Sequence, residues 1–120
     1  MEKSGRPVNK PVVSEVKPMK VTRWKKEQGQ PSLDMIRGLI AKEGLRCYTW
    51  SDAPGKFYPE HAHEEDEMRW IVQGSLIVGV NGKEIKLKAG DKIELPAGTT
   101  HWARVSEDAP IIYICATRTS

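Results

Sequence analysis

Long apolar runs and cysteines are both scarce in this chain. No stretch approaches the ~20 apolar residues that a membrane helix needs, and the first 25 residues lack the apolar core of a signal peptide. Cys47 and Cys115 are its two cysteines, and neither has the close-spaced partner typical of a cysteine zinc site. We therefore expect a cytoplasmic protein without a membrane span, whose two thiols are reduced and buried as small hydrophobic groups.

Basic charge is concentrated at one end. Residues 1–30 hold eight Lys or Arg against three Asp or Glu, whereas the other ninety residues hold eleven against thirteen. Pro7, Pro11 and Pro18 interrupt this basic segment, so we interpret residues 1–30 as a tail that is largely disordered or extended. Solubilising disorder explains such a tail more simply than nucleic-acid binding does. Lys20–Lys25 could add an edge strand, either to this chain or to a partner subunit.

The chain has no glycine-rich phosphate loop, and it has three histidines. All three lie in two short segments that also contain carboxylates. A hydrolytic triad would have to use one of these three histidines, which would break the pattern. Imidazole is the commonest neutral metal ligand, and a carboxylate is its usual companion for a divalent ion. The histidines therefore favour a metal site.

The spacing of the two segments resembles the cupin motifs. In the first segment, Gly55 is followed after five residues by His61 and His63, and then by Glu67 and Gly74. In the second, Gly90 is followed by a Pro-x-Gly sequence at Pro96 and by His101, with Val105 where the family often has Asn. Because that Asn is not a ligand, the departure bears on local loop structure rather than on the metal.

The resemblance implies an all-β fold, a cupin-type jelly-roll barrel with one short N-terminal helix. We expect the barrel over residues 45–120, and over residues 31–44 a helix that packs on it, capped by Ser32 and stopped by Gly44. From Leu45 the apolar period becomes two, and Asn81-Gly82 predicts a hairpin between the strands at 75–80 and 83–87. A homodimer is also expected, because cupins often pair their sheets.

The resemblance also implies a ligand set. His61, His63, Glu67 and His101 would hold one divalent transition metal, and Fe, Mn, Ni, Cu and Zn are all compatible with three imidazoles and a carboxylate. His61 and His63 stand two residues apart, so on one strand they would face the same cavity.

Alternation along the strand after Glu67 extends this cavity. It turns Arg69 and Ile71 inward with Glu67, while Met68, Trp70 and Val72 face the other way. Arg69 is then either a clamp for a substrate anion or a partner of Glu67 or Asp66 that supports the ligands.

Aromatic residues are assigned in the same way. Phe57 would share the side of His61 and line the mouth of the cavity, and Trp102 would face outward. Tyr48, Trp50 and Tyr113 are expected in the core.

Three functions compete. The first is a dioxygenase-like enzyme that acts on an anionic or hydroxylated small organic substrate. The second is a non-catalytic binding or sensor protein, in which the metal orients a small-molecule ligand. The third, an isomerase or epimerase, fits least, because no His–carboxylate dyad is free for proton transfer.

Overall fold

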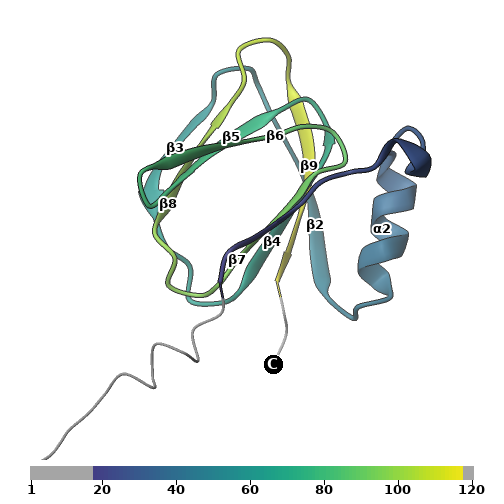
Figure 1. Ribbon diagram of the computed structural model, residues 1–120, viewed down its shortest axis with the longest axis horizontal. Helices are drawn as coiled ribbons and strands as arrows, with labels where there is room; N and C mark the ends of the chain where they lie inside the picture. The colour runs from purple at the N-terminus through teal and green to yellow at the C-terminus, as the bar shows by residue number, and fades with distance from the viewer. Residues whose placement is uncertain (1–17, 118–120) are drawn as a thin grey trace, which may run out of the picture.

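The chain folds into two antiparallel β-sheets that enclose a barrel (Figure 1). The computed structural model describes residues 18–117, so most of the predicted tail lies outside the described residues. Five strands form the first sheet in the order β1 (Lys20–Thr22), β7 (Lys92–Leu95), β4 (Glu67–Gln73), β9 (Ile111–Thr117) and β2 (Arg46–Asp52). Four strands form the second in the order β3 (Phe57–His61), β8 (His101–Val105), β5 (Leu76–Val80) and β6 (Lys83–Leu87). The predicted jelly-roll barrel is confirmed.

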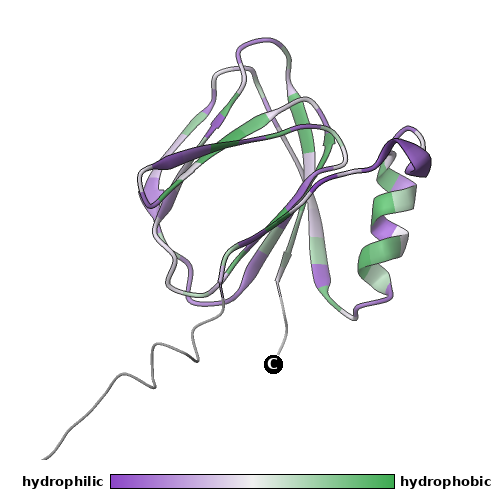
Figure 2. Cartoon of the chain, viewed as in Figure 1, coloured by the Kyte–Doolittle hydropathy of each residue, from purple (hydrophilic) through white to green (hydrophobic). Residues whose placement is uncertain are grey.

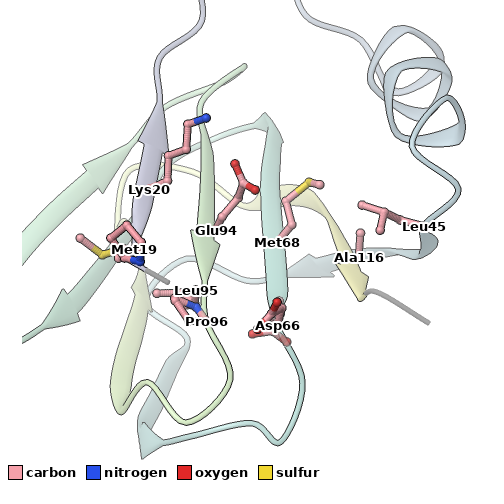
Figure 3. A pocket seen from close by; sticks show the side chains of 11 residues that line it. Met19, Lys20, Leu45, Asp66, Met68, Glu94, Leu95, Pro96 and Ala116 are labelled. Atoms are coloured by element: carbon pink, nitrogen blue, oxygen red, sulfur yellow. The ribbon is translucent and has the colours of Figure 1, made fainter. Parts of the chain in front are cut away.

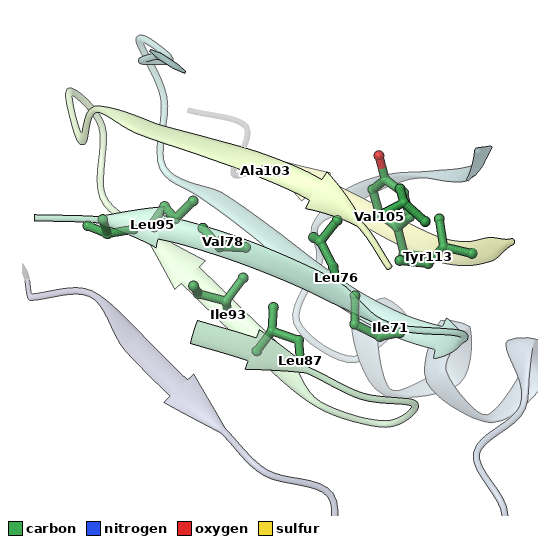
Figure 4. Packing of buried hydrophobic residues seen from close by; sticks show 11 residues of the cluster. Ile71, Leu76, Val78, Leu87, Ile93, Leu95, Ala103, Val105 and Tyr113 are labelled. Carbon is green, nitrogen blue, oxygen red and sulfur yellow. The ribbon is translucent and has the colours of Figure 1, made fainter. Parts of the chain in front are cut away.

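Apolar side chains from both sheets pack together inside the barrel (Figure 4). Every second residue of a strand points to the same face, so each strand contributes alternate positions to this core. The buried members of this cluster are Ile71, Leu76, Val78, Val80, Leu87, Ile93, Leu95, Ala103, Val105, Ile111 and Tyr113. Burial raises the pKa of Tyr113 well above its usual range, and this residue lies in the core as predicted.

A second apolar cluster covers the outer face of the five-stranded sheet. Helix α2 (Leu33–Ala41) begins after Ser32, whose side chain accepts a hydrogen bond from the Met35 amide at 3.2 Å. Its apolar side faces the sheet and its polar side faces away (Figure 2), and its fully buried residues are Ile36 and Ile40. Among the described residues, no helix is long and apolar enough to cross a membrane.

Strand β4 lies between the barrel core and helix α2, so it is buried on both faces. Met68, Trp70 and Val72 pack under the helix, whereas Ile71 belongs to the barrel core. This alternation is the one that the sequence predicts.

Two local predictions are confirmed. Asn81 and Gly82 both have positive φ angles, 53° and 76°, and the hairpin joins β5 to β6 in the register Val80 to Lys83. Where the family often has Asn, the Val105 side chain is fully buried, and its amide donates to the Lys56 carbonyl at 2.9 Å. A backbone hydrogen bond thus connects residue 105 to residue 56, although the Asn side chain is missing.

Residues 20–24 are attached to the barrel of their own chain. Strand β1 pairs with β7, and the Asp91 carboxylate accepts hydrogen bonds from the Arg23 guanidinium at 2.8 Å and the Trp24 amide at 3.0 Å. The Trp24 ring lies so close to Gly90 that a Cβ there would approach it to 2.2 Å. A side chain at position 90 would therefore displace Trp24.

Burial by itself would raise the pKa of Asp91, but the amide bonds from Lys88 and Trp24 and the charge of Arg23 outweigh it, so the pKa is lowered below its usual 3.8. The ionised carboxylate therefore stabilises the fold, fully at pH values above the unfolded pKa. That contribution is lost as the pH falls through the lower folded pKa.

We predict that Asp91→Asn lowers the free energy of unfolding by about 1.5–3 kcal/mol at pH 7, the range for a hydrogen bond to a charged group. Urea unfolding of metal-free protein measures it. The difference from the unsubstituted protein should shrink between about pH 5 and pH 3. The control is Glu84→Gln, at an exposed position of β6, and it should change stability by less than about 0.5 kcal/mol. A pH-independent difference would contradict this account.

Candidate metal centre

The three histidines converge at one end of the barrel. His61 ends strand β3, His101 begins the neighbouring strand β8, and the register pairs them directly. His63 lies past the end of β3, so it does not share a strand with His61 as the sequence suggested. It still meets His61 ring edge to face, with centroids 4.8 Å apart, and the potential ligand atoms of all three lie within 4.8 Å of one another.

Backbone contacts bring the two motifs together. The Gly98 amide donates to the His63 carbonyl at 2.9 Å, and the Ala97 amide donates to the Asp66 carboxylate at 2.9 Å. Both donors belong to the Pro-x-Gly turn, which is closed by a bond from the Thr99 amide to the Pro96 carbonyl. The turn thus holds the loop that carries His63 against the strand that carries His101.

Two imidazoles are oriented by backbone carbonyls. The Nδ1 atom of His61 lies 2.7 Å from the Pro59 carbonyl oxygen, and that of His101 lies 2.9 Å from the Thr99 carbonyl oxygen. A carbonyl only accepts, so each Nδ1 carries the proton and each Nε2 presents a lone pair. Burial and the nearby Arg69 and His61 lower the pKa of His101 below its usual 6.5, although Thr99 and Glu67 oppose them. The ring therefore stays neutral at physiological pH.

Several buried polar atoms at this site have no hydrogen-bond partner. They are His63 Nε2, His101 Nε2, Glu67 Oε1 and Arg69 Nε. His63 Nε2 and Glu67 Oε1 lie 3.2 Å apart without forming a hydrogen bond, as two groups do when both offer lone pairs. A buried acceptor without a partner costs about 1–3 kcal/mol, so the three acceptors His63 Nε2, His101 Nε2 and Glu67 Oε1 fit a divalent cation between them.

Arg69 lies beside these acceptors. Its Nη2 atom is 3.4 Å from Glu67 Oε1, and both side chains are about nine-tenths buried. The pairing accounts for one part of the guanidinium, while Nε remains without a partner. The geometry therefore contains both the ion pair and a free donor that an anion could occupy.

Cys115 packs against the barrel core, and it lies beside Arg69, a neighbour that sequence reasoning did not predict. It pairs with Arg69 in the β4–β9 register, so the two side chains share the inner face of the sheet. Burial raises the pKa of its thiol to about 11, although Arg69 acts in the opposite direction. The group is therefore a neutral thiol at physiological pH. In the sequence, Cys115 is two residues after Tyr113, so strand alternation places both on one face. Only the pairing of β9 with β4 shows that Arg69 is its neighbour on that face.

Aromatic residues near the site differ from their predicted places. A register shift between Tyr58 and His61 reverses the face of the strand, so Phe57 points outward and contacts Trp102, with ring centroids 6.0 Å apart. Trp102 faces outward as predicted. Tyr48 and Trp50, expected in the core, are 52% and 49% exposed.

A barrel of two antiparallel sheets with converging histidines defines a class of β-barrel metal proteins. Comparison with known families assigns the chain within it: the cupin domain matches residues 48–117, and the chain belongs to this family. Solved structures agree in fold. A cupin protein from Bacteroides fragilis, 22% identical, superimposes with a TM-score of 0.56 over 63% of this chain and 66% of that one. A DMSP lyase from Ruegeria pomeroyi, 27% identical, gives a TM-score of 0.57 over 63% of this chain and 39% of that one.

The curated relatives most similar to this chain share the name acireductone dioxygenase. An acireductone dioxygenase from Gluconacetobacter diazotrophicus is 38% identical over 80 residues, which cover 63% of this chain and 42% of the relative. The acireductone dioxygenase from Homo sapiens is 33% identical, with 86% of this chain and 65% of the relative covered. The chain spans about half the length of the curated relatives it matches.

We predict that purified protein holds about one divalent ion per chain, and that His61→Ala or His101→Ala lowers this content strongly. Glu64→Gln, which changes an exposed carboxylate in the same loop, is the matched control and should keep the metal. Mass spectrometry of bound metal measures both. Affinity should fall as the pH drops below about 6.5, because protonation removes the imidazole lone pairs. Full metal retention in both alanine variants would sink the assignment.

Proposed function

We propose that the barrel binds one divalent transition metal through His61, His63, His101 and Glu67. The observation that carries this proposal is the convergence of the three imidazoles, whose potential ligand atoms lie within 4.8 Å of one another. His63 Nε2, His101 Nε2 and the neighbouring Glu67 Oε1 are in addition buried without a hydrogen-bond partner. Three neutral nitrogens and one carboxylate suit Fe, Mn, Ni, Cu or Zn. Four ligand residues leave two positions of a six-coordinate ion for water or substrate, or one if Glu67 binds through both oxygens. A redox-active ion with open positions supplies the chemistry of O₂ activation.

We further propose a dioxygenase-like enzyme that acts on an anionic or hydroxylated small organic substrate. The relatives named acireductone dioxygenase support the reaction class, and the cavity supports the charge of the substrate. Arg69 supplies a buried cation with an unused donor, and Cys115 beside it is a neutral thiol that adds no negative charge. With the divalent ion in place, the positive charges of that ion and of Arg69 would exceed the single negative charge of Glu67, so the site would attract a substrate anion.

The side chains around the site assist by binding and orientation. Arg69 would hold the substrate anion through Nε, while its Nη2 contact keeps Glu67 turned toward the histidines. Apolar residues beside and beyond the site are almost completely buried, among them Val80, which pairs with His101, and Ala103. They exclude water, which strengthens the charge–charge contacts of the site.

Metal-loaded protein should consume O₂ when an acireductone is supplied. Arg69→Met should keep its metal but weaken binding of small carboxylates by about 2–5 kcal/mol, the scale for removing one partner of a buried charge pair. Oxygen-electrode and calorimetric titrations measure these effects. Arg104→Met, which changes the outward guanidinium 5.4 Å from the Trp102 ring, is the control and should bind carboxylates normally.

The outcomes separate the candidate functions. Carboxylate binding without O₂ consumption, for every metal that the protein retains, would support a binding or sensor protein instead. Loss of metal in Arg69→Met, or disturbance of the Glu67 side chain, would show that Arg69 supports the ligands rather than the substrate.

We also propose a cytoplasmic homodimer. Both cysteines are free thiols, which favours a reducing compartment. An apolar groove of about 340 Å³ lies on the five-stranded sheet beyond the helix (Figure 3), and Met19, Leu45 and Met68 are among its lining residues. Such a surface suits a second copy of the chain.

Light scattering should give the mass of two chains at micromolar concentration. Leu45→Glu should shift this mass toward one chain, because it places a charge in the groove. Met35→Glu, on the exposed side of the helix, is the control and should leave the mass unchanged. A monomer in the unsubstituted protein would refute the homodimer.

A further inference from the structure

Two aromatic side chains face into the barrel and yet remain exposed. Tyr48 pairs with Cys115 and Trp50 pairs with Tyr113 in the β2–β9 register. Directly paired residues of an antiparallel sheet point to the same face, and both partners pack with the barrel core. Tyr48 and Trp50 are nonetheless 52% and 49% exposed, so the inner face of the five-stranded sheet is not fully covered at its β2 edge.

The β2 edge lies along the line where the two sheets meet without pairing, which we call the β2–β3 seam. Strand β2 is the edge of the five-stranded sheet, and β3 is the edge of the four-stranded sheet. Side chains bridge the seam near the turn that joins the strands: the Trp50 indole donates to the Tyr58 hydroxyl at 3.3 Å, which donates to Asp52 at 2.7 Å. Tyr48 lies farther from that turn, toward the end of β3 that carries His61.

The exposed aromatic pair is connected to the metal centre by the sheet register. Tyr48, Cys115 and Arg69 occupy one row across β2, β9 and β4, on the inner face. Neighbouring strands lie about 4.8 Å apart, so the row places Tyr48 about 10 Å from Arg69. Arg69 in turn contacts Glu67 at 3.4 Å. Tyr48 therefore stands at the outer end of a row that leads to the ligand set, and Trp50 ends the neighbouring row, with Tyr113 and Ile71, on the same face.

We propose that the β2–β3 seam is the entrance to the metal centre, and that Tyr48 and Trp50 form an aromatic wall that selects the substrate by its apolar substituent. The inference rests on the proposed function, since it takes Arg69 as the site of the anionic group. The substrate class is thus a small organic anion with an apolar chain: the charge lies at Arg69 and the chain extends along the row toward the seam. Aromatic rings at such a position offer apolar area while their polar edges remain in water.

A series of carboxylates on zinc-loaded, full-length protein tests the wall. Calorimetry should show that affinity rises from acetate through butyrate to hexanoate, by about two-fold for each half-buried methylene, or roughly 16-fold overall. Hexanoate should also shift the indole N–H resonance of Trp50, which the Trp50→Phe variant assigns, whereas acetate should shift it much less.

The decisive variant replaces both wall residues. Tyr48→Val combined with Trp50→Val keeps β-branched residues in the strand, and circular dichroism and zinc content confirm that it folds. It should bind acetate normally but lose the gain for hexanoate, to within about two-fold. Phe57→Val is the matched control: Phe57 is 51% exposed but faces outward, so this variant should retain the full gain.

Two results would overturn the wall: an undiminished gain for hexanoate in the double variant, or no response of the Trp50 resonance to hexanoate. If no carboxylate binds at all, the proposed anion site at Arg69 fails, and hexanol then tests the wall separately. A shift of the Trp50 resonance by hexanol that the Phe57 control retains would support the wall, and its absence would overturn it.

Discussion

The structure depends on the two-sided burial of strand β4. Its outer side chains Met68, Trp70 and Val72 pack under helix α2, and each large apolar side chain contributes about 1.5–3 kcal/mol when it is fully buried. On the opposite face the same strand carries Glu67 and Arg69, whose burial is costly unless their charges are paired. The apolar face therefore offsets the polar one, and the strand can carry a charged pair into the barrel only because a helix covers its back.

The histidines and Glu67 are held in place by contacts with the surrounding backbone rather than by hydrogen bonds to one another. Carbonyls of Pro59 and Thr99 orient two imidazoles, and the Pro-x-Gly turn connects the loop of His63 to the start of β8. These contacts place several lone pairs around one point, where they repel one another unless a cation lies between them. The centre is thus preorganised at a cost that ligand binding would recover, and this is the arrangement expected of a functional site rather than of a structural one.

Much of this arrangement could be predicted from local patterns. The cap at Ser32 and the Asn81-Gly82 turn depend on neighbouring residues alone, so sequence sufficed for both. The alternation after Glu67 also held, because a strand between two packed layers cannot slip by one residue without exchanging its faces. The places of Phe57 and Trp50 were wrong for a different reason. A register shift after Tyr58 reverses the strand, and the exposure of Trp50 depends on which sheet edges meet.

The sequence by itself determined which residues we propose for the chemistry: three imidazoles and a carboxylate in two spaced motifs, and an arginine two residues beyond the carboxylate. It determined them because motif spacing and strand alternation are properties of the local chain. Only the tertiary structure decided that Cys115 and Tyr48 stand in one row with Arg69, and that the Tyr48 side chain remains exposed there. These relations join strands β2, β4 and β9, which lie far apart in the chain, and such distant pairings follow from the packing of the whole barrel rather than from any segment of it.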